Sequence, residues 1–281
     1  MDFDERQYLS DPLAGVFRAT VRRRETGGDG LVRVWLDRTC FYPESGGQPD
    51  DRGTLGGHRV RGVIEDAGGV CHVVEEAPAG GAAVEGARRE GTPVEGARHE
   101  GALVEGATVE GRIDMARRLD HMQQHTGQHL LSRVLAREAG RATIGFHLGE
   151  RSSTIDLDGE ADEAMLERIE VLGNELVMRN LPVVQRVLAR AEYEAAPGAD
   201  EVRSRLPGDV ERVRIVEIEG VDRSTCCGTH CLATGMIGPV KILSAESVRG
   251  GTRVEFVCGL RAVRDASAKH ALLRRLGLMF S

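Results

Sequence analysis

The stretch IDMARRLDHMQQHTGQHLLSRVLAREAG, residues 113 to 140, predicts a long amphipathic helix. Its mostly apolar face repeats at intervals of three and four residues, which is the period of one side of a helix. Asp114 is a suitable N-cap and Gly140 a suitable end. The residues of this face are Met115, Leu119, Met122, Thr126, Leu130 and Val134. Such a face must be covered by other elements, so the stretch predicts the centre of a domain.

The residues after this helix predict a domain in which helices pack on a largely antiparallel sheet. Short β-prone runs are interspersed with two further helical stretches. The expected strands are 142–149, 152–158, 182–188, 212–220, 240–248 and 252–259, and the expected helices are 163–180 and the residues from about 260 onward. We therefore expect an α+β domain from 113 to 281.

The residues before the helix predict a small antiparallel β-barrel. From Phe17 to about His72, short β-prone runs are separated by glycine and aspartate turns. In the loop FYPESGGQPDDRGTL, residues 41 to 55, proline and glycine residues exclude regular structure. The three decapeptides at 82–111 are too short and too polar to build a core, so we expect an expanded β-connection there. An N-terminal barrel domain is assigned to 1–112, with the Gly-rich loop and the repeat included.

The composition excludes a general nucleic-acid binder and a membrane protein. The formal net charge is −7, and one Trp, three Tyr and six Phe are too few for a broad base-stacking platform. No segment approaches the ~20 apolar residues needed to cross a bilayer, and the first residues lack the pattern of a secretory signal. We expect a soluble, cytoplasmic protein whose RNA contacts, if any, are confined to local patches.

Histidine and cysteine residues gather in two short segments. His121, His125 and His129 lie four residues apart in the predicted helix, so either neighbouring pair can direct two imidazoles at one point. Spacing alone does not choose between these pairs. In the segment DRSTCCGTHC, Cys226 and His230 form Cys-x-x-x-His, and tetrahedral zinc prefers thiolate and imidazole ligands. A helical pair and this loop pair together predict a four-coordinate zinc site.

The cysteine distribution favours a metal site over a disulfide framework. Three of the six cysteines fall within the same short segment, which suits metal ligation better than disulfides. Cys227 and Cys231 are rival ligands, although neighbours on a turn usually point apart. The alternative to a metal site is a set of buried, small apolar cysteines in a turn, with histidines that are exposed or satisfied locally.

Three motifs together resemble the AlaX family, the freestanding relatives of the alanyl-tRNA synthetase editing domain. They are FYPESGGQPDDRG at 41–53, HTGQH at 125–129 and CCGTH at 226–230, and they follow the order of the family. The likeness runs over most of the chain, interrupted by the decapeptide repeat. The barrel with its GGQP loop resembles the medium-length type. Cys227 stands where the synthetase form commonly has glycine, which leaves the ligand spacing unchanged.

The resemblance implies a hydrolase that deacylates mischarged tRNA(Ala), chiefly seryl-tRNA(Ala), with glycyl-tRNA(Ala) as a second candidate. It implies one Zn²⁺ ion per chain. The metal ligands carried over from the family are His125, His129, Cys226 and His230. It also makes Gly46, Gly47 and Gln48 candidates for lining the substrate pocket. Thr143 matches a family threonine that is thought to sense the hydroxyl of serine.

Editing in a separate site is reasonable because an apolar pocket rejects an added hydroxyl by only about 10²-fold. Zinc can activate water or polarise an ester carbonyl, and both roles need an open coordination position. Four protein ligands are the pattern of a closed site. We therefore expect zinc to anchor the aminoacyl end while a nearby side chain positions water. The candidates for this catalytic role are His121, Gln124 and Gln128, which sequence alone does not rank.

The expected partner is the acceptor end of tRNA(Ala) carrying serine or glycine, with arginine side chains on its phosphates. Fewer than half of the candidate arginines are expected to touch RNA, since most surface arginines are merely solvated. The candidates are Arg112, Arg117, Arg118, Arg133, Arg137, Arg141, Arg203, Arg205, Arg212 and Arg214. No membrane partner is expected, and the protein is expected to be a monomer or a weak dimer.

Two other classes of function compete with an editing enzyme. One is a non-catalytic tRNA-binding module, in which the closed zinc site only holds the helix and the loop together. The other is a general zinc hydrolase for small esters or amides. The second is disfavoured because glutamines, and no glutamate base, lie beside the histidines of the helix.

Overall fold

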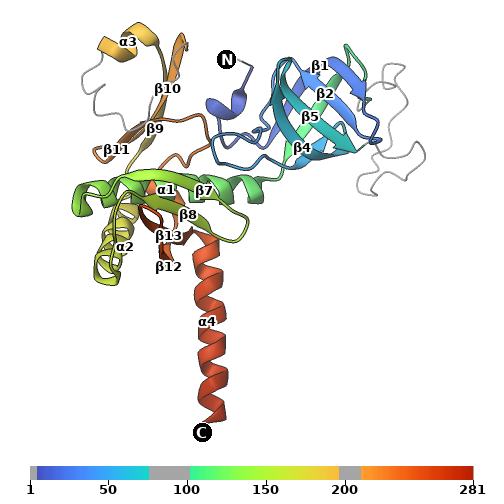
Figure 1. Cartoon of the computed structure of the whole chain (residues 1–281). Helices are drawn as coiled ribbons and strands as arrows, with labels where there is room; N and C mark the ends of the chain where they lie inside the picture. Colours follow the sequence, from blue (N-terminus) through green and yellow to red (C-terminus); the bar gives the residue numbers. More distant parts are fainter. Residues whose placement is uncertain (1–4, 76–101, 196–209, 281) are drawn as a thin grey trace. The chain divides into compact units, whose positions relative to one another are not determined.

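The computed structural model describes residues 5–75, 102–195 and 210–280, which form two compact units (Figure 1). The segment Ser45–Pro49 belongs with the described residues from Leu119 onward. The remaining described residues up to Arg118 form the other unit. The first two copies of the decapeptide repeat, Arg203 and Arg205 lie outside the described residues.

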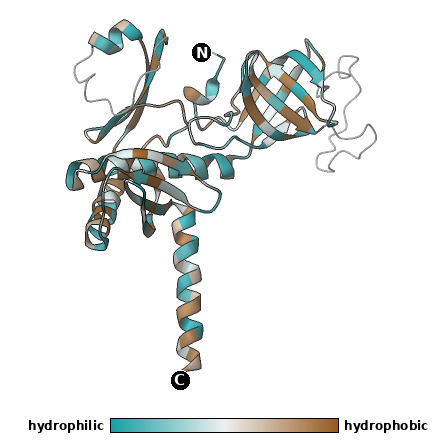
Figure 2. Cartoon of the chain, viewed as in Figure 1, coloured by the Kyte–Doolittle hydropathy of each residue, from teal (hydrophilic) through white to brown (hydrophobic). Residues whose placement is uncertain are grey.

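The unit that ends at Arg118 is a closed antiparallel barrel with the strand order β1-β2-β5-β4-β3-β6, which confirms the predicted fold. Alternate side chains of β1 are buried, and Figure 2 shows hydrophobic and hydrophilic residues along the barrel strands. Val34, Leu55 and Val63 are among the residues that fill the interior. The elements are η1 (Gln7–Leu9), β1 (Val16–Thr26), β2 (Val32–Leu36), β3 (Gly53–Leu55), β4 (His58–Asp66), β5 (Gly69–Glu75) and β6 (Thr108–Ile113).

Two barrel strands lie where the sequence predicted irregular structure. β6 consists mostly of the last residues of the third decapeptide and pairs with β1 and β3, so the prediction of a β-connection is wrong for these residues. β3 lies at the end of the Gly-rich loop. The alternation in β6 buries Val109 and Ile113. Such short strands are recognised only when their neighbours are known, because their pairing partners lie far away in sequence.

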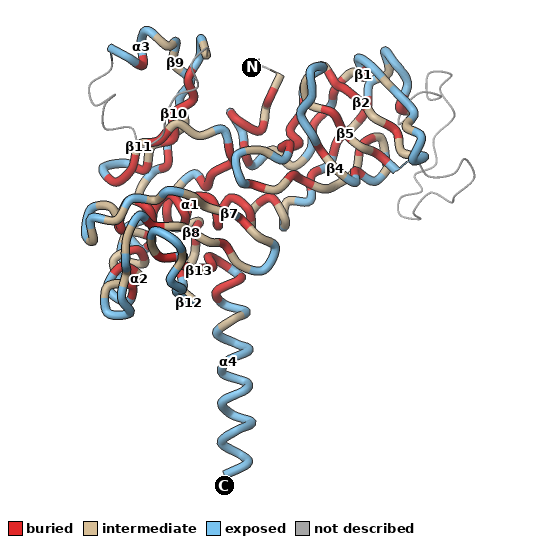
Figure 3. Tube along the Cα trace, in the orientation of Figure 1, coloured by how far each residue is buried: buried red, intermediate tan, exposed pale blue. Residues whose placement is uncertain are grey.

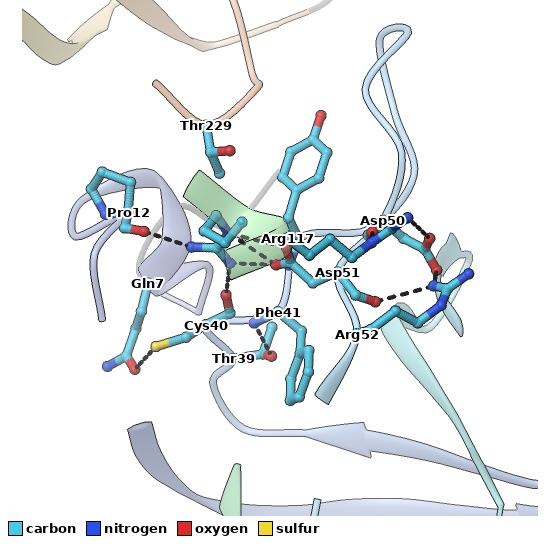
Figure 4. A network of polar contacts seen from close by, with 12 residues as sticks. Gln7, Pro12, Thr39, Cys40, Phe41, Asp50, Asp51, Arg52, Arg117 and Thr229 are labelled. Atoms are coloured by element: carbon cyan, nitrogen blue, oxygen red, sulfur yellow. Dashed lines mark hydrogen bonds and ion pairs between the residues drawn. The ribbon is translucent and has the colours of Figure 1, made fainter. Parts of the chain in front are cut away.

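A fully buried ion pair joins the first turn of α1 to the loops of the barrel unit. Arg118 Nε lies 3.1 Å from both carboxylate oxygens of Asp51, and neither side chain is exposed. Arg118 Nη1 donates to the carbonyl of Pro12 (2.7 Å) and Nη2 to that of Cys40 (2.5 Å). Figure 4 shows this network around Asp51. Because its guanidinium is buried, Arg118 is not available for RNA phosphate, and that part of the sequence interpretation is wrong.

His72 is buried in the barrel as a neutral imidazole. Its Nδ1 donates to the carbonyl of Val34 (3.0 Å), and its Nε2 accepts from the hydroxyl of Thr39 (2.8 Å). Burial lowers the pKa of His72 to about 4. As the pH falls, the imidazole of His72 is therefore protonated first in the unfolded chain. The contribution of neutral His72 to the free energy of unfolding is complete above about pH 6.5 and is lost toward pH 4.

We expect the free energy of unfolding of the barrel to fall less between pH 7 and pH 4.5 in His72→Phe than in the wild type. The full contribution of a shift of this size is about 3 kcal/mol. Trp35, the only tryptophan, lies in β2, so its fluorescence during urea unfolding reports on the barrel. His270→Phe, at an exposed position, is the control and should keep the wild-type slope. Equal slopes in wild type and His72→Phe would contradict this account.

The other unit is of the α+β class, as predicted. It contains a four-stranded antiparallel sheet in the order β12-β13-β8-β7 and a three-stranded antiparallel sheet in the order β11-β10-β9. Its helices are α1 (Met115–Ala139, beginning in the barrel unit), α2 (Glu163–Met178), α3 (Arg190–Ala195), η3 (Thr234–Ile237) and α4 (Leu260–Met279). Its strands are β7 (Thr143–Leu148), β8 (Ser153–Leu157), β9 (Val183–Ala189), β10 (Arg212–Ile218), β11 (Asp222–Thr225), β12 (Val240–Val248) and β13 (Gly251–Cys258).

The core of this unit forms around one side of α1. Leu130, Leu131 and Leu135 of this helix are fully buried and belong to one cluster with Ile155 and Phe256 of the four-stranded sheet. The predicted cap is confirmed, because Asp114 Oδ1 accepts from the first backbone amides of α1. In contrast, α4 is mostly exposed after its first turn (Figure 3). In the described parts of the chain, no helix is long and apolar enough to span a membrane.

Candidate metal centre

Four potential metal ligands converge in the α+β unit. His125 and His129 come from α1, and Cys226 and His230 come from the loop after β11; their ligand atoms all lie within 4.8 Å of one another. Cys226 Sγ is 3.4 Å from His125 Nε2 and 3.3 Å from His230 Nε2. His121 is not part of this group. The geometry therefore selects the second of the two histidine pairs that spacing had left equivalent.

The rival cysteines lie outside the ligand group. Cys227 is exposed, whereas Cys231 is fully buried in the core beside α1. The backbone amide of Cys231 donates to Thr126 Oγ1 (2.9 Å). Among the described residues, only one cysteine, Cys226, is therefore grouped with the histidines.

The loop that carries Cys226 is held by a buried arginine and packs tightly on α1. Arg214 Nη1 donates to the carbonyls of Cys226 (2.7 Å) and Gly228 (2.8 Å). A Cβ at position 228 would lie 2.1 Å from the imidazole of His125, so only glycine fits there. Arg214 is 3% exposed, which contradicts its interpretation as a phosphate ligand. Its charge stabilises the loop of the metal centre instead.

Each of the three histidines is held through its Nδ1 atom. His125 Nδ1 lies 2.8 Å from Gln48 Oε1, and His129 Nδ1 lies 3.2 Å from Asp222 Oδ2. His230 Nδ1 lies 3.3 Å from Thr126 Oγ1. A ligand histidine commonly donates its second ring N–H to such a partner, which fixes the tautomer and the ring orientation. The three Nε2 atoms are thus left to face the centre of the cluster.

Sequence reasoning gave none of these three partners an anchoring role, and only Gln48 was a candidate site residue. Asp222 begins β11 and also accepts from the hydroxyl of Ser224 (2.8 Å). Thr126 lies between the two ligand histidines and was assigned only to the apolar face of the helix. An aspartate four residues before the ligand cysteine was visible in DRSTCC, but only the pairing of β11 with β10 shows which way it points.

The charges of the cluster suit a metal cation. Burial acts to raise the pKa of the Cys226 thiol, but the facing imidazoles of His125 and His230 hold this pKa well below its usual value. Burial lowers the pKa of His230 to about 3. Burial also acts to lower the pKa of His129, but Asp222 and Cys226 raise it overall. Thiolate sulfur and imidazole nitrogen are the ligands that zinc prefers, so these four residues could hold one ion.

A cavity of about 500 Å³ opens beside the cluster. It is lined by Gly46, Gly47, Gln128, Thr143 and Phe146, together with His125, His129 and Cys226. Gly47 has a positive φ of 80°, and a Cβ there would lie 2.9 Å from the ring of Phe146. Glycine is therefore required for the loop backbone to approach this wall of the cavity.

A small polar group occupies one wall of the cavity. Gln128 Nε2 donates to Ser132 Oγ (2.8 Å), and the hydroxyl of Thr143 donates to the same oxygen (2.7 Å). Gln128 is 1% exposed, and within the described residues its Oε1 has no hydrogen-bond partner. Gln128 Oε1 is therefore a buried acceptor without a partner in the described part of the chain, at a residue that lines the cavity, and Thr143 Oγ1 keeps lone pairs that can accept.

The other predicted site residues have different surroundings. Gln48 is fully buried and bonded to His125, and it is not among the residues that line the cavity, in contrast to its predicted role. Gln124 Oε1 accepts from the Cys258 amide (2.8 Å), and its Nε2 donates to the Cys258 carbonyl (3.1 Å), so its side chain joins α1 to β13. His121 is buried within α1. Of the three candidates for positioning water, only Gln128 lines the cavity.

Comparisons with known proteins show which families this chain resembles. Residues 213–255 match the family model "Threonyl and Alanyl tRNA synthetase second additional domain". The alanyl-tRNA editing protein AlaX-L of Pyrococcus horikoshii is 34% identical over 271 residues, or 92% of this chain and 59% of that protein. The alanyl-tRNA editing protein Aarsd1 of Danio rerio is 33% identical over 250 residues, or 88% and 54%.

A synthetase is equally similar over a smaller share of its length. The alanine–tRNA ligase of Korarchaeum cryptofilum is 35% identical over 283 residues, which cover 95% of this chain and 28% of the ligase. The chain thus spans little more than half the length of the two editing proteins and about a quarter of the ligase. The similarity includes both described units, since it covers nearly the whole chain.

Proposed function

Because this chain belongs to the AlaX family, the freestanding relatives of the alanyl-tRNA synthetase editing domain, we propose that it hydrolyses mischarged tRNA(Ala) at a zinc centre. The substrates would be seryl-tRNA(Ala) and, as a second candidate, glycyl-tRNA(Ala). One observation carries the proposal: three of the four residues of the metal cluster line a cavity, which is also lined by Gln128 and Thr143. A metal-dependent deacylase would use both a cation near the ester and groups that recognise the amino acid.

His125, His129, Cys226 and His230 would hold one zinc ion. When bound, this ion would supply a positive charge that helps to hold the aminoacyl end of the substrate beside the cavity wall. The protein contributes the orientation of the ligands, through the three Nδ1 anchors, and the exclusion of water from the buried side of the cluster. With four protein ligands the centre is closed, so recognition of the substrate must come mainly from the cavity wall.

Gln128 is the residue best placed to position the attacking water. Its Oε1 is a buried acceptor without a partner among the described residues, and its Nε2 is fixed by Ser132. A water molecule that donates to Oε1 would keep a lone pair free to approach the ester carbon. An amide cannot remove a proton at neutral pH, so Gln128 would orient the water and would not act as a general base. His121 and Gln124 are less suitable, because neither lines the cavity.

Thr143 is proposed to recognise the hydroxyl of serine. Its own proton is directed to Ser132, so Oγ1 presents lone pairs to the cavity. A seryl hydroxyl can donate to this oxygen, whereas an alanyl methyl group cannot. Binding of alanine would leave the acceptor without a partner in a partly buried site, which costs free energy. This arrangement favours removal of serine over removal of the correct amino acid.

We expect Thr143→Val to lower the preference for seryl-tRNA over alanyl-tRNA about fivefold to tenfold, the value of one hydrogen bond of about 1 kcal/mol. The measurement is the ratio of the two deacylation rates with the same tRNA(Ala). Thr143→Ser keeps the hydroxyl and is the control, with a ratio near that of the wild type. If the ratio of Thr143→Val equals the wild-type ratio, Thr143 does not read the hydroxyl.

The alternative of a non-catalytic tRNA-binding module makes a different prediction. The discriminating experiment compares the deacylation of seryl-, glycyl- and alanyl-tRNA(Ala) by the zinc-loaded protein. Loss of serine or glycine with sparing of alanine supports the editing enzyme. Binding of tRNA without release of any amino acid would support the module, in which zinc only joins α1 to the loop after β11.

A further inference from the structure

Gln48 makes three hydrogen bonds although it is far in sequence from the residues it contacts. Its Oε1 is 2.8 Å from His125 Nδ1 and 3.0 Å from the backbone nitrogen of Thr229. Its Nε2 donates to Thr229 Oγ1 (2.9 Å). The side chain is fully buried and belongs to the same compact unit as its partners. Both polar ends of the amide are therefore engaged inside the metal centre.

The backbone of Thr229 determines which way the Gln48 amide points. A backbone N–H can only donate, so the Gln48 atom that faces it must be the carbonyl oxygen. The same oxygen faces His125 Nδ1. An amide oxygen can only accept, so Nδ1 must carry the proton and Nε2 must carry the lone pair. The lone pair of His125 is thus directed toward Cys226 Sγ, 3.4 Å away, at the centre of the cluster.

Packing leaves the His125 ring little freedom to leave this orientation. The imidazole lies against the backbone of Gly228. A Cβ at position 228 would lie 2.1 Å from the His125 ring and 2.9 Å from Gln48 Oε1. The ring of Phe146 lies on another side, with ring centroids 5.7 Å apart. Of the three anchors, Gln48 is the only amide, whereas Asp222 is a carboxylate and Thr126 a hydroxyl. Replacement of Gln48 therefore removes an uncharged acceptor without changing the charge of the centre.

We propose that Gln48 is a positioning residue that fixes the tautomer and orientation of His125 as a metal ligand. This inference rests on the proposed zinc site and replaces the predicted role of Gln48 in lining the substrate pocket. The GGQP loop then has two functions within three consecutive residues. Gly46 and Gly47 place backbone against the cavity, while Gln48 holds a ligand of the metal from behind.

The test compares Gln48→Met with Gln48→Glu, using zinc affinity measured by competition with a chromophoric chelator. Methionine has a similar length but offers no acceptor to His125, so we expect a dissociation constant 10–100-fold higher, about the usual effect of losing such a partner. Glutamate keeps an acceptor for both His125 and Thr229, so we expect an affinity within about threefold of the wild type.

Asn174 offers a matched control, because its amide also makes three hydrogen bonds, to Glu170 and Val240, away from the metal centre. We expect Asn174→Leu to lose folding stability but to keep the wild-type zinc affinity. An unchanged affinity in Gln48→Met, or an equal loss in Asn174→Leu, would overturn the assignment. If the wild-type protein binds no zinc, the proposed zinc site is rejected, and with it the role of Gln48 as a residue that positions a metal ligand.

A second measurement needs no variant and decides the question if Gln48→Met does not fold. Long-range ¹H–¹⁵N spectra of the zinc-loaded wild-type protein distinguish a protonated imidazole nitrogen from a metal-bound one. We expect His125 to carry its proton on Nδ1, in a hydrogen bond, and its metal contact on Nε2. A proton on Nε2 of His125 would overturn the proposal, because Nδ1 would then have no proton to donate to Gln48 Oε1.

Discussion

Cys226→Ala is expected to abolish stoichiometric zinc binding and to lower the deacylation of seryl-tRNA(Ala) by about 10³-fold or more. Loss of a residue that only orients a ligand costs 10–100-fold, and loss of the ligand itself must cost more. Cys226 has a further role, because its sulfur lies within 3.4 Å of the Nε2 atoms of His125 and His230. Without the thiolate, the positive charge of the metal ion would face only neutral imidazoles.

The neighbouring cysteine supplies the control for metal content. Cys227→Ala should retain one zinc ion per chain, because Cys227 is exposed and lies outside the ligand cluster. Zinc is measured by metal analysis after dialysis, and deacylation by release of labelled serine. A chelator should reduce the activity of the wild type to the level of Cys226→Ala, and added zinc should restore it. Full activity in the zinc-free protein would refute a role for the metal in the reaction.

The ligand set could be predicted only in part from the residues themselves. The spacing of His121, His125 and His129 gave two equivalent pairs, and the family resemblance favoured the second. Physically, the choice depends on which side of α1 faces the loop after β11, and this depends on how the helix packs on the sheet. The buried leucines of α1 determine which side of the helix faces the core. The sequence of the helix does not show which strands these leucines pack against.

The anchors and the short strands were harder to predict for the same reason. Gln48 and His125 are 77 residues apart in the sequence. They meet because the loop that carries Gln48 belongs to the same compact unit as His125. β6 was hidden in a repeat that is mostly polar, since its six residues become a strand only between β1 and β3. Long, periodic elements were predictable because their pattern is local, whereas these features depend on contacts between distant segments.

Two of the arginines named as candidates for phosphate contact are buried in the structure. Arg118 and Arg214 were proposed to contact phosphate, yet both are buried and bonded to backbone carbonyls within the protein. A charged arginine can be buried when hydrogen-bond acceptors surround its guanidinium. The N–H groups of this planar group can donate to several fixed acceptors at once. Composition does not reveal those acceptors, because they are mostly carbonyl groups of loops.

Arg118→Met is expected to destabilise the barrel by about 3–5 kcal/mol, since removal of one partner leaves the other as an uncompensated buried charge. That partner is Asp51, which also accepts from the amide of Tyr42 (2.7 Å). Arg118 further satisfies the carbonyls of Pro12 and Cys40, so its loss would leave these acceptors unbonded too. The measurement is the free energy of unfolding in urea, followed by the fluorescence of Trp35.

Two further variants separate the buried charge from lost packing. Asp51→Asn in the Arg118→Met background removes the uncompensated carboxylate but keeps an acceptor for the Tyr42 amide, so it should recover part of the loss. Arg117→Met is the matched control in the same turn of α1. Arg117 also bonds to Asp50, but its side chain is 25% exposed, so water can replace its contacts, and we expect a loss of about 1 kcal/mol or less. If Arg117→Met and Arg118→Met were equally destabilising, burial of the ion pair would not be the cause.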